Sequence, residues 1–326
     1  MRYVESVPTT KKISVIGLGT WQFGSSEWGY GDAYAEAGCA TIVRRALELG
    51  VTLFDTAEIY GYGRSERILG AALGDSASDA FIATKVFPLL PTAPVVEQRA
   101  VASANRLGVD HLDLYQVHQP NPLIRDRTTM RGMAALRTVG LVGEVGVSNY
   151  SLGRWQEAEA ALGGRVLSNQ VQYSLVDRRP EHDLLPWAEA TGRLVIAYSP
   201  LGQGLLSGRY DAEHLPANGV RRLNPIFLPE NLRRATGLVT TLREVADAHD
   251  ASPAQIALAW LVHHPHVVAI PGASSVAQLE SNAAAADIAL ADDEYAALSA
   301  ASDRLDLLSG VRTLGPLARK LAGRTS

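Results

Sequence analysis

The chain has 326 residues, with 30 Lys and Arg against 34 Asp and Glu, which gives a formal net charge of -4 at pH 7. A slightly acidic chain without a basic block is not suited to binding nucleic acid or an anionic membrane surface, and 47% hydrophobic residues predict a large globular core. The single cysteine, Cys39, excludes an intrachain disulfide, and no apolar N-terminal or membrane-spanning stretch is present, so we expect a cytoplasmic protein.

Short apolar runs typical of β-strands alternate along the chain with longer segments of helical period. The eight runs span residues 14–17, 52–55, 81–85, 113–118, 144–148, 167–172, 194–199 and 267–271. The helical segments between them span residues 35–49, 65–73, 94–107, 127–139, 151–161, 181–190 and 252–263. This alternation predicts an α/β protein, a single (β/α)8 TIM barrel over residues 1–326. Two doubly wound domains are the alternative.

Two segments lie outside the regular alternation. The interval between the seventh and eighth runs contains an insertion over residues 200–251 with several glycines and the arginine-rich stretch GVRRLNPIFLPENLRR. It predicts either a functional loop or a surface excursion followed by a helix over residues 229–248. Residues 304–326 form a C-terminal tail, for which a short docked helix and a frayed end both stay open.

Four polar residues mark the ends of the first predicted strands, where the loops of a (β/α)8 barrel carry the reactive groups. Asp55 ends the run at residues 52–55 within LFDTA, Tyr60 follows in AEIYGYG, Lys85 ends FIATK and His118 ends LYQVH. Each has an ordinary structural explanation when taken alone: a turn cap, a packed aromatic, a solvated strand end and a core histidine. Together they are the side chains that an acid catalyst needs.

The chemistry of this set follows from the weak acidity of a phenol. Tyrosine has an ordinary pKa of about 10, so Tyr60 donates a proton at neutral pH only if its phenolate is stabilised. We expect Lys85 to lower the pKa of Tyr60, and Asp55 to keep Lys85 charged and in place. A neutral His118 is expected to hydrogen-bond a substrate oxygen. The predicted reaction is proton donation to a polarised carbonyl group.

Eight segments of the sequence resemble the aldo-keto reductases in order and spacing, between about Ile13 and Ile288. They are VIGLGTWQFG, LFDTAEIYGYGRSE, IATKVF, DLYQVHQP, GEVGVSNYS, NQVQYS, AYSPLGQGLLSG and IPGASSVAQLESN. The resemblance implies that Asp55, Tyr60, Lys85 and His118 form the catalytic tetrad of that family, with Tyr60 as the general acid. It implies an NAD(P)H-dependent oxidoreductase that reduces aldehydes and ketones to alcohols.

The same resemblance implies a nicotinamide cofactor bound without a Rossmann domain. Ser148, Asn149 and Gln170 match the side chains that hold the carboxamide, and Tyr198 matches the aromatic residue that stacks on the nicotinamide ring. The other positions that match cofactor-binding residues of the family are Gly19, Thr20, Trp21, Asp55, Ser199, Pro200, Leu201, Gly202, Gly204, Gly272, Ser274, Gln278 and Asn282.

The cofactor motif departs from the family pattern at the adenosine end. Many members carry Lys or Arg at the positions of Gly272 or Ser274, and Glu at the position of Ser281, and this chain has none of them. We therefore expect Arg221, with Arg222 behind it, to pair with a 2'-phosphate. NADPH and NADP are the expected cofactors, and NADH is the alternative.

The substrate pocket is less well specified by the sequence. Trp21, Trp28, Phe87 and Phe227 indicate an aromatic-lined pocket for a small carbonyl substrate of little charge. The sequence predicts no oligomeric state.

We expect no metal site, because the cluster of His263, His264 and His266 has no carboxylate or cysteine close in sequence and ends a predicted helix away from the barrel mouth.

Two other functions stay open. The pattern also resembles the cofactor-binding β subunits of potassium channels, which predicts a redox sensor with little turnover, and Lys85 could serve a barrel isomerase or aldolase as a Schiff-base nucleophile.

Overall fold

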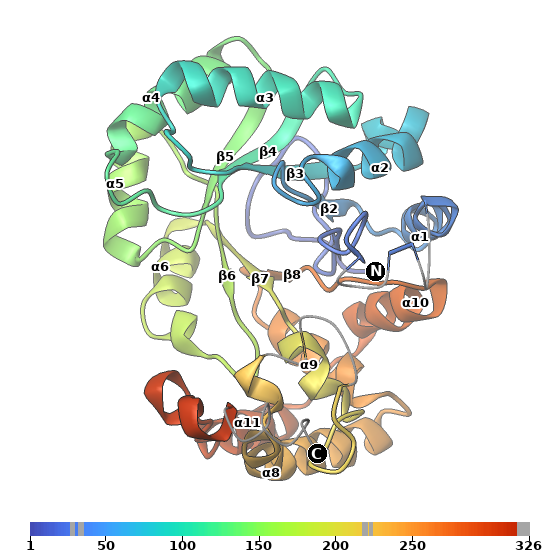
Figure 1. Ribbon diagram of the computed structural model, residues 1–326. Helices are drawn as coiled ribbons and strands as arrows, with labels where there is room; N and C mark the ends of the chain where they lie inside the picture. Colours follow the sequence, from blue (N-terminus) through green and yellow to red (C-terminus); the bar gives the residue numbers. More distant parts are fainter. Residues whose placement is uncertain (27–29, 32–35, 217–220, 222–223, 318–326) are drawn as a thin grey trace.

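The computed structural model describes residues 1–26, 30–31, 36–216, 221 and 224–317. Eight parallel strands are hydrogen-bonded to one another in chain order. They are β1 (Leu18–Gly19), β2 (Leu53–Asp55), β3 (Phe81–Val86), β4 (Leu112–Val117), β5 (Val142–Ser148), β6 (Ser168–Gln172), β7 (Leu194–Tyr198) and β8 (Val267–Ala269). Parallel bridges from Ile16 to Ala269 and from Gly19 to Gly272 join the last strand to the first. The predicted (β/α)8 barrel is therefore confirmed (Figure 1).

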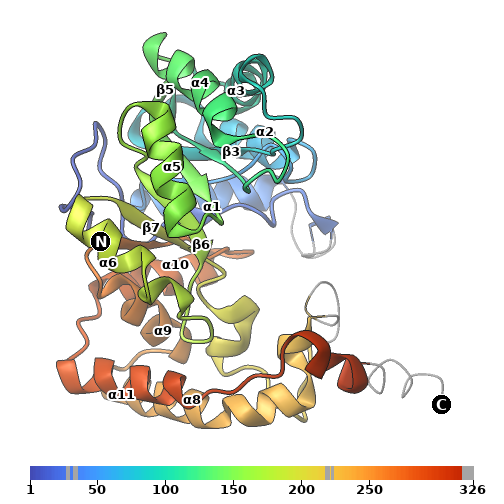
Figure 2. The same cartoon turned by 90° about the vertical axis from the view of Figure 1, so that its left-hand side faces the viewer.

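The helices surround the strands on the outside (Figure 1). They are α1 (Glu36–Glu48), α2 (Arg64–Leu73), α3 (Ala93–Leu107), α4 (Asp126–Thr138), α5 (Leu152–Leu162), α6 (Leu184–Thr191), α8 (Pro229–Ala248), α9 (Pro253–Val262), α10 (Val276–Ala284) and α11 (Asp292–Asp303). The insertion after β7 ends in α8, which matches the predicted helix and lies beside α11 (Figure 2). This arrangement leaves the loops after the strands to form one mouth.

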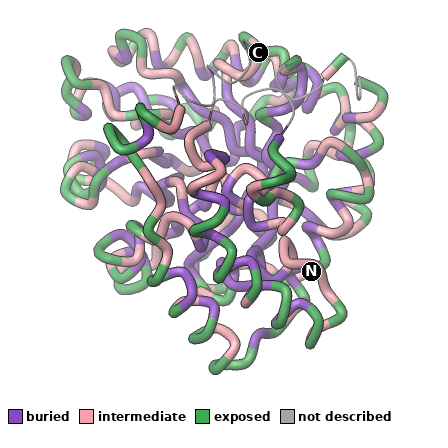
Figure 3. The backbone as a smooth tube through the Cα atoms, turned by 60° about the horizontal axis from the view of Figure 1, so that its bottom comes forward, coloured by how far each residue is buried: buried purple, intermediate pink, exposed green. Residues whose placement is uncertain are grey.

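The core consists of two apolar layers separated by the strands. All residues of β3 and β4 are buried, as expected for parallel strands covered on both faces. The barrel interior is filled by a cluster of Val7, Ile13, Leu53, Phe81, Ala83, Leu114, Leu167, Leu194, Ile196, Val268 and Ile270. A larger layer lies between the strands and the helices. Figure 3 shows buried residues concentrated at the centre of the chain trace and exposed residues around it. The packed interior holds the strand ends rigidly.

Local sequence signals fix several element boundaries. Ser252 caps α9, where its hydroxyl accepts the Gln255 N–H while the Gln255 side chain accepts the Ser252 N–H. Pro253 occupies the first turn, where its missing N–H costs nothing. The start of the helix expected over residues 252–263 is therefore confirmed.

Two predicted boundaries are wrong. The first strand was expected at residues 14–17, but regular pairing with β2 begins at Leu18, because Ser14 pairs with Tyr3 in an N-terminal hairpin. The helix expected over residues 181–190 begins at Leu184, because Arg179–Glu181 forms a separate 3-10 turn. The first difference comes from pairing with another segment, and the second from a local turn.

The described part of the C-terminal tail is docked against α8. The Asn231 side chain donates to the Leu308 carbonyl at 3.1 Å and accepts the Leu308 N–H at 2.7 Å. Asp306 pairs with both Arg234 and Arg312. Of the two expectations for residues 304–326, a docked segment is found at residues 306–308, and residues 318–326 lie outside the described part.

The three clustered histidines each have a structural contact. The His263 ring stacks on Tyr295, with ring centroids 4.4 Å apart. His266 Nδ1 lies 2.8 Å from the Arg193 carbonyl oxygen, and His264 faces Glu189 at 3.6 Å.

Within residues 1–317, gaps excepted, no helix is long and apolar enough to cross a membrane.

Candidate active site

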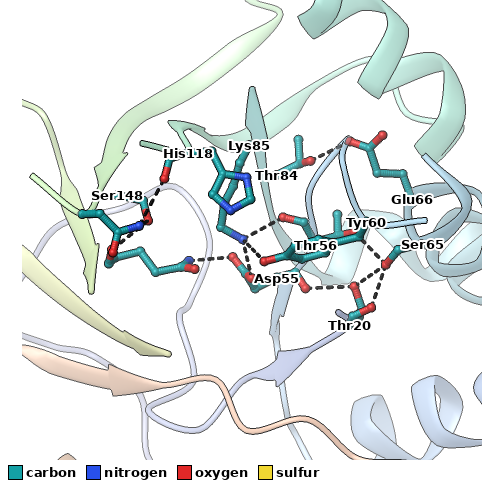
Figure 4. Close-up of polar contacts among 12 residues, drawn as sticks. Thr20, Asp55, Thr56, Tyr60, Ser65, Glu66, Thr84, Lys85, His118 and Ser148 are labelled. Atoms are coloured by element: carbon teal, nitrogen blue, oxygen red, sulfur yellow. Dashed lines mark hydrogen bonds and ion pairs between the residues drawn. The ribbon is translucent and has the colours of Figure 1, made fainter. Parts of the chain in front are cut away.

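The strand ends bring the residues predicted as catalytic together at one mouth of the barrel (Figure 4). Asp55 ends β2, Lys85 lies next to the end of β3, and His118 directly follows β4. Tyr60 lies in the loop between β2 and α2. These residues are far apart in sequence but close in space, because parallel strands end at the same edge of the sheet.

Lys85 and Asp55 form a buried ion pair at the centre of the site. Lys85 Nζ lies 2.6 Å from Asp55 Oδ1, and both side chains are essentially excluded from solvent. The ammonium also donates to the Thr56 carbonyl at 2.9 Å. Burial lowers the pKa of Lys85, but the charges of Asp55 and Tyr60 and the hydrogen bonds to both together raise it more, so the pKa lies above its ordinary value. Lys85 is therefore held as a cation.

Tyr60 lies within reach of this cation. Lys85 Nζ is 3.4 Å from the Tyr60 hydroxyl and 5.1 Å from the centre of its ring. Burial raises the pKa of Tyr60, Lys85 opposes the rise and Asp55 adds to it. Lys85 therefore lowers the pKa of Tyr60 as expected, but burial exceeds this effect and the pKa lies above its ordinary value. Tyr60 is protonated at neutral pH.

His118 is neutral at physiological pH, as expected. Burial and then the positive charge of Lys85 lower its pKa to about 3. Its ring packs edge-on against Tyr60 and Phe87, at centroid distances of 5.8 and 6.2 Å. Nδ1 is buried and has no hydrogen-bond partner among the described residues. A neutral imidazole with an unused nitrogen is a hydrogen-bonding group available to a ligand.

A chain of polar side chains extends from Asp55 across β5, β6 and β7. Gln170 donates to Asp55 Oδ2 at 2.7 Å, and the Ser148 hydroxyl donates to the Gln170 carbonyl at 2.8 Å. Asn149 donates to Ser148 Oγ at 3.0 Å and accepts the Tyr198 hydroxyl at 3.0 Å. The predicted carboxamide-binding residues and the predicted stacking tyrosine thus form one network with the ion pair.

The loop after β7 curls tightly over residues 199–208. Ser199 and Gln203 have positive φ angles of 50° and 56°, which are unusual for residues other than glycine. Gly202 and Gly204 also have positive φ angles, and the Gly204 N–H donates to the Leu201 carbonyl. Pro200 is buried at the start of the turn. The turn is therefore held by main-chain hydrogen bonds within residues 199–208.

Arg221 contacts this loop at Gln203. Its Nε donates to the Gln203 carbonyl at 2.7 Å, and the Gln203 side chain accepts from Asn224 at 2.9 Å. Arg222, expected behind Arg221, lies outside the described residues. Sequence reasoning missed Gln203, and the signal for it was its position between Gly202 and Gly204.

The remaining predicted cofactor residues lie where β1 and β8 end. Gly19 pairs with Gly272, and Asn282 of α10 donates to the Gly272 carbonyl at 3.3 Å. The N–H and hydroxyl of Ser274 both donate to Gln278 Oε1, at 2.9 and 3.1 Å. The predicted adenosine-end residues therefore form one cluster at the start of α10.

The aromatic residues predicted for the substrate pocket are only partly brought together. The Trp21 and Tyr60 ring centroids lie 6.3 Å apart, and Phe87 packs on His118. Phe227 is fully buried and packs edge-on against Tyr210, so its assignment to the pocket is wrong; the ring fills the core beneath the insertion. Trp28 lies outside the described residues.

Comparisons with known proteins agree with this geometry. The model of the Aldo/keto reductase family matches residues 15–303. An uncharacterized oxidoreductase of Mycobacterium tuberculosis strain H37Rv is 54% identical over 324 residues, covering 99% of this chain and 100% of that protein. Methylglyoxal reductase YeaE of Escherichia coli strain K12 is 34% identical over 290 residues, covering 89% of this chain and 91% of that protein.

A solved structure gives the same answer for the fold. The aldo/keto reductase from Klebsiella pneumoniae, crystallised with NADP and acetate, aligns with a TM-score of 0.74 and 29% identity, covering 94% of this chain and 99% of that one. The match spans nearly the whole chain. The chain therefore belongs to the aldo/keto reductase family and is an oxidoreductase.

Proposed function

We propose that this protein is an NADPH-dependent reductase that converts aldehydes and ketones to alcohols, with Tyr60 as the general acid. The observation that carries the proposal is the contact of the Tyr60 hydroxyl with Lys85 Nζ at 3.4 Å, while Lys85 is paired with Asp55 at 2.6 Å. A phenol beside a buried cation is suited to proton donation, because the cation stabilises the phenolate that forms. The names of the relatives support the same chemistry.

The residues at the mouth fit a nicotinamide dinucleotide. Ser148, Asn149 and Gln170 offer hydroxyl and amide groups next to Asp55 that match the donors and acceptors of a carboxamide. Gly202 and Gly204 in the loop after β7 have positive φ angles and carry no Cβ, so the main chain of this loop can approach a pyrophosphate closely. When bound, the cofactor supplies the hydride for the carbonyl carbon.

The protein's own groups act on the carbonyl oxygen. Tyr60 transfers its proton to that oxygen, and Lys85 stabilises the phenolate left behind. Asp55 keeps Lys85 charged and pointed at Tyr60. Neutral His118 donates a hydrogen bond from its ring to the same oxygen and orients the substrate, and the Trp21 and Phe87 rings supply apolar walls.

The state of Lys85 argues against a Schiff-base enzyme. A nucleophilic lysine needs a free amine and therefore a lowered pKa. Lys85 has a raised pKa and donates to Asp55 and the Thr56 carbonyl. The amine nitrogen has no lone pair to offer a carbonyl carbon in this state, so the acid-catalysed reduction fits the site better.

The preference for NADPH rests on Arg221. This residue is anchored to the loop through the Gln203 carbonyl, and a guanidinium pairs well with a phosphate dianion. The N–H and hydroxyl of Ser274, at the start of α10, provide further donors once Gln278 releases them. NADH is the alternative cofactor if these groups do not contact the 2'-position.

The test is turnover of an aldehyde and ketone panel with NADPH and, separately, with NADH, in the wild type and in Tyr60→Phe. Tyr115→Phe is a matched control, because Tyr115 lies on β4, is fully buried and has a hydroxyl without a hydrogen-bond partner among the described residues. We expect repeated turnover in the wild type and in Tyr115→Phe, and a loss of about 100-fold or more in Tyr60→Phe.

Other outcomes would contradict the proposal in distinct ways. NADPH binding without turnover of any carbonyl would favour a redox-sensing subunit. Full activity of Tyr60→Phe would remove Tyr60 as the general acid. Covalent trapping of a carbonyl compound on Lys85 by borohydride, without any nicotinamide, would favour the Schiff-base chemistry.

A further inference from the structure

Ser65, on the second residue of α2, joins three segments of the mouth through one buried hydroxyl group. Its Oγ donates to the Thr20 carbonyl at 2.8 Å and lies 2.8 Å from Thr20 Oγ1 and 3.0 Å from Thr56 Oγ1 (Figure 4). The three side chains are completely shielded from solvent. Thr20 in turn donates to the Asp55 carbonyl at 2.9 Å. Buried hydroxyl groups with this many partners hold the backbone segments that carry them.

Ser65 holds the loop that carries Tyr60 at two points, its first residue and Tyr60 itself. The hydroxyl of Ser65 contacts Thr56 where the loop begins, and its backbone N–H donates to the Tyr60 carbonyl at 3.2 Å. The first N–H groups of a helix have no partner within the helix, and Gly63, which precedes α2, offers no side-chain cap. The start of α2 therefore uses one of these N–H groups to hold Tyr60.

The same contacts reach Lys85. The carbonyl of Thr56 accepts the Lys85 ammonium at 2.9 Å, and that ammonium lies 3.4 Å from the Tyr60 hydroxyl. Thr56 and Tyr60 are thus loop residues that contact the Lys85 ammonium, and Ser65 contacts both. A shift of the loop changes the distance between the acid and its cation directly.

We propose that Ser65 is a positioning residue for the reduction, which sets the distance between Tyr60 and Lys85 through its contacts with Thr56 and with the Tyr60 backbone. This inference rests on the proposed function of Tyr60. Ser65 is fully buried and contacts Thr20, Thr56 and the Tyr60 carbonyl, so it acts through these residues. Its effect is expected in kcat, because a displacement of about 1 Å at a reacting group can cost about 100-fold in rate.

The experiment compares Ser65→Ala with Ser14→Ala. Ser14 is a matched control, because it is also fully buried and its hydroxyl contacts three backbone groups, of Ile16, Thr52 and Leu53, at the opposite end of the barrel. We expect both variants to lose thermal stability. Only Ser65→Ala should lose at least about tenfold in kcat, with the KM values for carbonyl and NADPH within about twofold of the wild type.

The pH profile between about pH 7 and 11 gives a second readout. Lys85 opposes the rise in the Tyr60 pKa, so a looser loop in Ser65→Ala should move the alkaline limb of kcat to higher pH. A merely structural role would leave that limb where it is. Thr56→Val, which removes the hydroxyl at similar volume, should show the same kcat loss, and combining it with Ser65→Ala should add little. If Ser65→Ala fails to fold, Thr56→Val alone tests the same contact.

The outcomes separate the two proposals. If Tyr60→Phe retains turnover, the proposed function is overturned, and so is the role of Ser65, which depends on it. If Tyr60→Phe is inactive while Ser65→Ala and Ser14→Ala share the same kcat and the same alkaline limb, only the role of Ser65 is overturned. Independent, additive losses in Ser65→Ala and Thr56→Val would also overturn it.

Discussion

Lys85 Nζ and Asp55 Oδ1 lie 2.6 Å apart in the interior of the barrel mouth, and neither side chain is open to solvent. Two opposite charges in this setting are stable only as a pair, because each compensates the lost hydration of the other. The pair has a functional consequence, since it keeps a cation beside the Tyr60 hydroxyl. Stability and acid chemistry are therefore coupled at this position.

Removing the negative charge alone should be costly. In Asp55→Asn the buried ammonium of Lys85 loses its counter-charge, and we expect a loss of about 3–5 kcal/mol in the free energy of unfolding, together with loss of turnover. The double variant Asp55→Asn with Lys85→Met removes both charges and should be more stable than Asp55→Asn alone. Urea unfolding of the three proteins measures this, and a single variant as stable as the wild type would contradict it.

His118 should make the protein sensitive to acid. Its pKa is about 3 when folded against an ordinary value near 6.5, so the unfolded chain binds a proton that the folded chain does not between these pH values. Stability is therefore lost as pH falls below about 6.5, by about 2 kcal/mol between pH 7 and pH 5. Urea unfolding at both pH values should show a smaller loss in His118→Gln.

His214→Gln is the control for this experiment. His214 is exposed and pairs with Asp211 at 2.9 Å, which raises its pKa. A raised pKa stabilises the folded state at low pH, so removing His214 should not reduce the acid loss. An equal acid loss in His118→Gln and the wild type would contradict the assignment of a buried neutral imidazole.

Two helical glycines should respond oppositely to alanine. A Cβ at Gly70 in α2 would overlap the backbone carbonyl of Leu107 at the end of α3, and we expect Gly70→Ala to cost about 1–3 kcal/mol through overpacking. Gly237 in α8 is exposed, and a Cβ added there would have no neighbouring atom within 4 Å. Gly237→Ala should stabilise the protein by about 0.5–1 kcal/mol. Thermal unfolding of both variants provides the comparison.

Arg221 should discriminate between the two nicotinamide cofactors. Arg221→Ala is expected to weaken NADPH binding by about tenfold or more, because a charge-assisted bond to the 2'-phosphate is lost, and to leave NADH binding within about twofold. Arg233→Ala, on an exposed position of α8, controls for the loss of one positive charge. Fluorescence titration gives both dissociation constants. An equal loss of affinity for NADPH and NADH would mean that Arg221 contacts a part of the cofactor that both molecules have.

The strand count and the strand-end residues were predictable from the sequence. Parallel strands buried on both faces are continuous apolar runs, so each run stands out against the helices. The polar residues that interrupt the runs, such as Asp55 and Lys85, then mark the strand ends. Their convergence follows from topology alone, because all eight strands run in the same direction.

Other features depended on contacts between distant segments. The N-terminal hairpin of Tyr3 and Ser14 shifted the first strand, and the burial of Phe227 beneath the insertion removed it from the pocket. The direction of the shift in the Tyr60 pKa could not be predicted from the sequence either. Burial and the charge of Lys85 act in opposite directions, and only the folded structure sets their balance.

The sequence by itself determined the barrel, its order of strands and the four residue types at the mouth, because periodicity and strand-end position are local properties of the chain. Only the tertiary structure decided the distances among them and the backbone contacts that maintain these distances. The Thr56 carbonyl that accepts Lys85 and the Ser65 N–H that holds Tyr60 are main-chain groups. Every residue except proline carries a main-chain N–H and a carbonyl, so the residue type does not indicate which of these groups makes a functional contact. The fold decides it.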